Sequence, residues 1–127
     1  MLLVGALMAG CGGDDSEPAG DTAGARAAAK RLFDALEKRD GDKACGELSR
    51  ELTRRVGDPC PRRVLRALIG PEAPRDSATG RVRADPDRAT VSMTWSTGHG
   101  AAERVVRQTV RLGRAGAGWR VDAVTGG

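Results

Sequence analysis

The first half of the chain repeats its apolar residues at helical intervals. Asp21 or Thr22 can cap a first helix, and residues 39–42 end it; the buried face of this helix would hold Ala25, Ala28, Ala29, Leu32, Phe33 and Leu36. Asp42 can cap a second helix, which residues 57–59 break and in which the apolar positions are Cys45, Leu48, Leu52 and Val56. Pro61 suits the first turn of a third helix, which Gly70 and Pro71 end. The pattern therefore predicts three consecutive helices.

After an expected linker at residues 72–78, the period changes from helical to alternating. A short strand is expected at 81–84 and a turn at 85–87, followed by the clearest alternation, which places Ala89, Val91, Met93 and Trp95 on one face. Residues 103–112 form a long strand after a turn at 97–100, with Val106, Gln108, Val110 and Leu112 on one face and Val105, Arg107, Thr109 and Arg111 on the other. A last strand starts at Trp119, after a glycine-rich turn at 113–118. Three helices followed by about four antiparallel strands predict an α+β domain over residues 25–127, with the helices on one side of the sheet.

The N-terminus has the pattern of an export signal. An uninterrupted apolar run at residues 2–9 is followed by Gly10, Cys11 and a polar segment, which resembles the end of a bacterial lipoprotein signal with Met8 in place of the usual leucine. We expect residues 1–10 to be a signal peptide, truncated at its start because no basic residue precedes the apolar run. Cys11 would carry the lipid, and residues 11–24 would form a flexible tether. The alternative is a soluble protein whose apolar N-terminus is buried or frayed.

Charge and aromatic content narrow the possible functions. The chain has 127 residues, too few for a multidomain enzyme. Residues 1–25 carry four acidic groups and no basic ones, so the net charge of +4 combines an acidic leader with a more basic body. Tyrosine is absent, and the aromatic residues are Phe33, Trp95 and Trp119. A nucleic-acid stacking surface is therefore not expected, and a tyrosine-based oxyanion site is excluded.

The chain contains three cysteines, and assigning Cys11 to the lipid leaves Cys45 and Cys60. An oxidising compartment favours a disulfide between these two. A metal site is the competing interpretation, but there is no CxxC motif, and the one histidine, His99, lies between two glycines in an expected turn. We expect neither a metal nor a cofactor.

Six arginines gather around the corner between the second and third expected helices: Arg50, Arg54, Arg55, Arg62, Arg63 and Arg66. On a membrane-tethered protein these corner arginines could contact anionic headgroups. Glu47 and Glu51 lie at helical spacing from several of them. A solvated, internally paired surface is therefore the favoured interpretation.

Several short segments, in this order, resemble small actinobacterial lipoproteins with a nuclear transport factor 2-like (NTF2-like) domain. They are residues 28–36 with 39–42, residues 44–49, Cys60-Pro61, residues 88–91 and the closing residues 118–122, so that the resemblance covers roughly residues 26–124. It implies a cone-like α+β fold, in which a curved antiparallel sheet wraps around an N-terminal helix. It also implies a Cys45–Cys60 bridge between the second helix and the start of the third.

The resemblance implies no particular reaction, because this fold hosts isomerases, cyclases, dehydratases and non-catalytic domains. His99 is expected in an exposed turn and Asp34 on a solvated helix surface, so no catalytic set can be named. We therefore expect a lipoprotein anchored on the outer face of the cell membrane, whose domain binds a small apolar ligand or an envelope protein without catalysis. An isomerase- or cyclase-like enzyme is the alternative. The side chains that would either line a ligand cavity or fill the core are Phe33, Leu36, Met93, Trp95 and Trp119.

Overall fold

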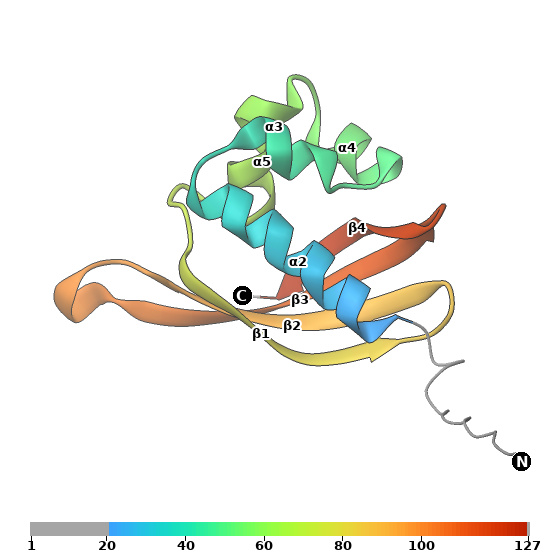
Figure 1. The fold of residues 1–127 in the computed structure, drawn as a ribbon. Helices are drawn as coiled ribbons and strands as arrows, with labels where there is room; N and C mark the ends of the chain where they lie inside the picture. Colours follow the sequence, from blue (N-terminus) through green and yellow to red (C-terminus); the bar gives the residue numbers. More distant parts are fainter. Residues whose placement is uncertain (1–20, 127) are drawn as a thin grey trace, which may run out of the picture.

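Helices cover one face of a four-stranded antiparallel sheet in the computed structural model, which describes residues 21–126 (Figure 1). The α-helices are α2 (Thr22–Glu37), α3 (Gly41–Gly46), α4 (Arg50–Val56) and α5 (Cys60–Leu68). The strands are β1 (Arg75–Ala84), β2 (Arg88–Thr97), β3 (Arg104–Ala115) and β4 (Gly118–Gly126), and they pair in chain order. This arrangement confirms the expected α+β class. The expected signal peptide at residues 1–10, the lipidation site Cys11 and all of the tether before Asp21 lie outside the described residues.

The long helix α2 lies across the sheet and contacts β1, β2 and β4. As expected, Asp21 caps it: the Asp21 carboxylate accepts a hydrogen bond from the backbone N–H of Gly24 at 2.7 Å. The buried face contains the apolar residues named above together with Ala35. Within residues 21–126, no helix is long and apolar enough to cross a membrane.

The prediction of one continuous second helix is wrong, because the chain forms α3 and α4 with a break between them. At the break, Leu48 forms a parallel bridge with Val121 of β4. The Ser49 N–H donates to the Val121 carbonyl, and the Val121 N–H donates to the Glu47 carbonyl, both at 2.8 Å. Asp40, and not Asp42, caps α3, while Ser49 caps α4. Backbone bonding to a distant strand thus overrides a helical spacing of apolar residues.

The strands extend beyond the segments expected from alternation. The expected linker at 72–78 is wrong in its second part, because β1 already begins at Arg75. There the backbone N–H and the hydroxyl of Ser77 both donate to the Glu37 carboxylate at the end of α2. The expected turn at 113–118 shortens to the residues between Ala115 and Gly118, because β3 and β4 continue to pair along this hairpin. Cross-strand pairing depends on neighbours that a local pattern does not contain.

A disulfide joins Cys45 of α3 to Cys60 of α5 and confirms the expected pairing. It closes a loop with a sequence separation of 15 residues. Both helices belong to the layer that covers the sheet (Figure 1). The disulfide therefore holds together the cover of the hydrophobic core.

Candidate functional site on the open face of the sheet

The side chains expected to line or fill a cavity all belong to the core. Phe33 and Leu36 come from α2, Met93 and Trp95 from β2, and Trp119 from β4, and none is more than 5% exposed. They belong to one continuous cluster of buried apolar residues between the helices and the sheet. Leu36 also borders a cavity of about 160 Å³ between α2 and α5. The covered face of the sheet is thus filled by its own side chains.

The buried polar groups of this interior serve mainly to satisfy each other. The side-chain oxygen of Gln108 accepts a hydrogen bond from the indole N–H of Trp95 at 2.8 Å, and both residues are buried. Ser77 is paired with Glu37 as described above. The indole N–H of Trp119 has no partner among the described residues, and the guanidinium of Arg114 lies 4.1 Å from the centre of its ring. The side chains of Ser77 and Gln108 are thus engaged in hydrogen bonds within the domain.

The titratable residues considered from the sequence lie on the surface. His99 is exposed and directly precedes a short 3-10 helix, η3 (Gly100–Ala102). Asp34 forms an ion pair with Lys30 one helical turn earlier, at 2.7 Å, and its side chain is 48% exposed. Hydrogen bonds from the Thr97 hydroxyl and the Gly98 N–H lower the pKa of Glu72 on the same rim as His99. Within residues 21–126, no group of three metal-ligating side chains could hold a metal ion.

The internal pairing favoured for the corner arginines is not what the structure shows. Glu47 forms its ion pair with Arg31 of α2, with an Nε–Oε2 distance of 3.0 Å. Only one other ion pair occurs among residues 21–126, and it is the one between Lys30 and Asp34. The corner arginines are therefore solvated without carboxylate partners in the described part of the chain.

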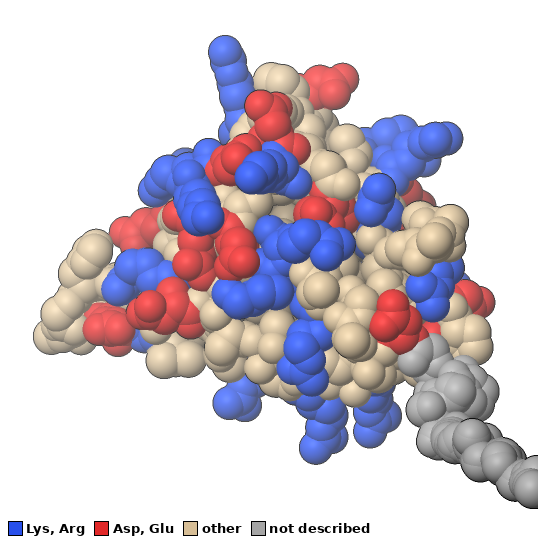
Figure 2. All heavy atoms as spheres, in the orientation of Figure 1, with Lys and Arg blue, Asp and Glu red and all other residues tan. Residues whose placement is uncertain are grey.

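The face of the sheet turned away from the helices carries a different set of side chains, which we call the open face. Strand register places Arg83, Thr90, Arg111 and Ala123 in one row across β1 to β4. Neighbouring rows contain basic, hydroxyl and small residues and Val105: Arg88 with Gly113 and Arg120, Ser92 with Thr109 and Thr125, Ala78 with Thr94 and Arg107, and Ser96 with Val105. The carboxylate of Asp122 lies over Gly113 on the same face. Figure 2 shows basic side chains projecting from the underside of the molecule, below the sheet. The open face is thus basic and rich in hydroxyl groups.

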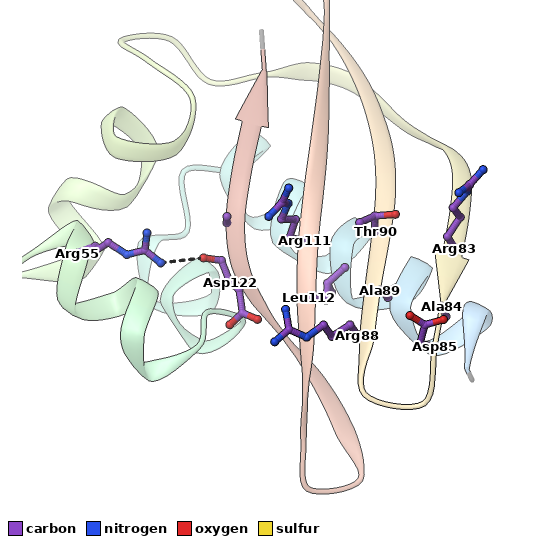
Figure 3. A pocket seen from close by; sticks show the side chains of 11 residues that line it. Arg55, Arg83, Ala84, Asp85, Arg88, Ala89, Thr90, Arg111, Leu112 and Asp122 are labelled. Carbon is purple, nitrogen blue, oxygen red and sulfur yellow. Dashed lines mark hydrogen bonds between the residues drawn. The ribbon is translucent and has the colours of Figure 1, made fainter. Parts of the chain in front are cut away.

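A cavity of about 660 Å³ lies at the end of the sheet near the β1–β2 turn, and its lining combines open-face residues with Arg55 of the helical layer. Four arginines line it from four elements, namely Arg55 of α4, Arg83 of β1, Arg88 of β2 and Arg111 of β3, as Figure 3 shows. Asp85 and Asp122 are its acidic lining residues, and the Asp122 carbonyl accepts a long hydrogen bond of 3.4 Å from Arg55. Guanidinium groups next to the Thr90 hydroxyl form a setting suited to phosphate or carboxylate oxygens.

Sequence reasoning did not identify this cavity. The alternation in residues 103–112 already places Arg107 and Arg111 on the face opposite Val110. Their alignment with Arg83 depends on strand register, which the sequence alone did not supply. The available signal was the arginine content of alternating segments, where solvated threonine and serine are more usual.

Comparison with known proteins adds one similar structure. No protein-family model matches the chain, and no curated protein matches it either. Among solved structures, the chain is similar to an NTF2-like family protein from Streptomyces avermitilis, described there as a candidate dehydratase. The two share 14% identity with a TM-score of 0.49, over 80% of this chain and 90% of that one.

Proposed function

We propose that the protein is an exported lipoprotein, anchored through Cys11 to the outer face of the cell membrane, and that its domain is a non-catalytic binding module. The observation that carries the binding assignment is the filled interior. Phe33 and Met93 are fully buried, and the buried polar side chains among residues 21–126 are Ser77 and Gln108, neither of which carries a charge. Such an interior leaves the surface as the place for recognition.

An enzyme of the isomerase or cyclase type would need a carboxylate or histidine facing an enclosed substrate. The described residues offer His99 on an exposed turn and Asp34 in a surface ion pair instead. The buried polar side chains, Ser77 and Gln108, are both occupied in hydrogen bonds. These placements support binding and not proton transfer.

The export half of the proposal is supported by the signal-like N-terminus and by the disulfide. A bridge between Cys45 and Cys60 persists in oxidising compartments and is rare in the cytosol. It leaves Cys11 as the one cysteine available for a lipid.

Mass spectrometry of native protein extracted from membranes tests the anchor. We expect Cys11 to be the mature N-terminus and to carry a diacylglyceryl group. A Cys11→Ser variant should leave the membrane fraction at high salt, whereas a Cys45→Ala/Cys60→Ala variant should stay there. Recovery of an unmodified Cys11 from the membrane fraction would contradict the lipoprotein assignment.

A further inference from the structure

We propose that the open face of the sheet rests on the anionic phospholipid headgroups of the membrane that carries the chain. This inference rests on the proposed function, because an anchored protein is always close to that surface. The membrane would thus be the partner of the binding module, and the open face would be the side that contacts it.

The charge of the sheet is the first argument. Its four strands contain nine arginines and two acidic residues, Asp76 and Asp122. The guanidinium groups of Arg83, Arg107 and Arg111 have neither a carboxylate within 4.0 Å nor a hydrogen bond to another described residue. Arginine binds phosphate oxygens through two parallel N–H groups and loses less hydration in doing so than lysine. Three uncommitted guanidinium groups on one face suit a surface of phosphates.

The residues between the arginines are also suited to a headgroup layer. Ser92, Thr94 and Thr109 occupy the middle of the open face and can donate hydrogen bonds to phosphate or glycerol oxygens. Val105 lies at one end of the same face with 72% of its surface exposed. It is the one strongly exposed large hydrophobic residue in the described part of the chain. An apolar side chain at the rim of a basic surface can enter the interfacial region beside the headgroups.

The position of the tether gives the third argument. Helix α2 begins beside the sheet, where Arg26 in its first turns donates to the Thr79 hydroxyl at 2.9 Å and to the Gly80 carbonyl at 3.0 Å. Figure 1 shows α3, α4 and α5 at the opposite end of the molecule. Cys11 precedes Asp21 by ten residues, which span at most about 35 Å. A lipid at Cys11 would hold the domain close to the membrane at the end away from α3, α4 and α5.

A second copy of the chain is a poor occupant of the open face. Pairing two such faces would bring two sets of guanidinium groups without carboxylate partners into one contact. Like charges brought together in a desolvated contact oppose association. An extended anionic surface has the complementary charge.

Vesicle binding by the full chain with Cys11→Ser tests the proposal, because this variant cannot carry a covalently attached lipid at residue 11. We compare vesicles of phosphatidylcholine alone with vesicles that also contain phosphatidylglycerol, and measure the bound fraction by co-sedimentation. The open-face variant is Arg83→Gln/Arg107→Gln/Arg111→Gln. The matched control removes the same charge from the helical side as Arg54→Gln/Arg62→Gln/Arg66→Gln, all exposed residues. Circular dichroism verifies that both variants fold.

We expect binding only to vesicles with phosphatidylglycerol, and weaker binding at high salt. Each arginine near such a surface contributes about a fivefold factor, so the open-face variant should bind roughly 100-fold more weakly. The control should lose less than about threefold. A Val105→Ser variant should lose a smaller factor that salt does not change.

Equal losses in the two triple variants, or equal binding to both vesicle types, would overturn the proposal. A dimer that the open-face substitutions dissociate would also overturn it. The same holds if the protein binds free inorganic phosphate but does not bind vesicles. The outcome is independent of the anchor test. An unmodified Cys11 with intact vesicle binding defeats the lipoprotein assignment, whereas a lipidated Cys11 with no open-face effect defeats only this orientation.

Discussion

Successive residues of β2 face two different environments. Met93 is fully buried against the helices, whereas its neighbour Thr94 lies on the open face between Ala78 and Arg107. The covered face has apolar side chains in close contact, while the open face has charged and hydroxyl side chains in water. The comparison teaches that the covered face specifies the fold and that the open face is available for recognition.

The largest expected effect is the difference in stability between a substitution on the covered face and a substitution on the open face. Met93→Ala should lower the free energy of unfolding by about 2–5 kcal/mol, because it removes buried atoms and leaves a cavity. Thr94→Ala, one residue further on, should change it by less than about 0.5 kcal/mol. Chemical denaturation measures both values. Similar losses in the two variants would show that the two faces do not differ as described.

Removing the disulfide tests the layer that keeps the covered face dry. Cys45→Ala/Cys60→Ala should cost about 3 kcal/mol, because the unfolded chain regains the freedom of a loop of this size. Thermal unfolding of this variant should match that of the reduced wild-type protein. A variant as stable as the oxidised wild type would mean that helix packing alone secures the cover.

Gln108 is a polar residue on the covered face, and its replacement tests why it is tolerated there. Gln108→Leu should cost about 1–3 kcal/mol, because the Trp95 indole N–H loses its buried acceptor. Thr109→Ala on the open face is the adjacent control. If Gln108→Leu were neutral or stabilising, the hydrogen bond to Trp95 would not be needed for a stable core.

The smallest expected effect concerns Glu72 on the exposed rim. The Thr97 hydroxyl, the Gly98 N–H and the charges of His99 and Arg75 hold the pKa of Glu72 below its ordinary value of 4.5. A lowered pKa in the folded state adds stability above the unfolded-state value, and this contribution disappears as the pH falls through the folded-state pKa. The free energy of unfolding of Glu72→Gln should therefore fall slightly less than that of the wild type as the pH decreases below about 4.5. An NMR titration that gives Glu72 an ordinary pKa would contradict this.

The local pattern of apolar residues correctly predicted the elements whose buried residues repeat at a regular interval. The stripe of α2 and the alternation of β2 appear as expected, because each repeats with the period of its own geometry. The break at Leu48 and the start of β1 at Arg75 were missed, because both depend on partners far along the chain: Val121 for the first and Ser96 for the second.

The site was harder to predict than the fold. The corner arginines were visible as a cluster in the sequence, and the structure leaves them without carboxylate partners and places one of them, Arg55, in the lining of the cavity. Arg83 and Arg111 lie far apart in the sequence, and only cross-strand register brings them into one row. The register between neighbouring strands has no signature in the local sequence.

The bridge between Leu48 and Val121 has a consequence for the behaviour of many copies of the protein. It occupies backbone groups along the first part of β4 that would otherwise accept a strand from another molecule. At the other edge, β1 contains two register irregularities and a positive φ at Asp76, which make it a poor template for pairing. Both borders of the sheet thus carry features that hinder edge-to-edge pairing. Many copies at high local concentration would therefore be less prone to form fibres.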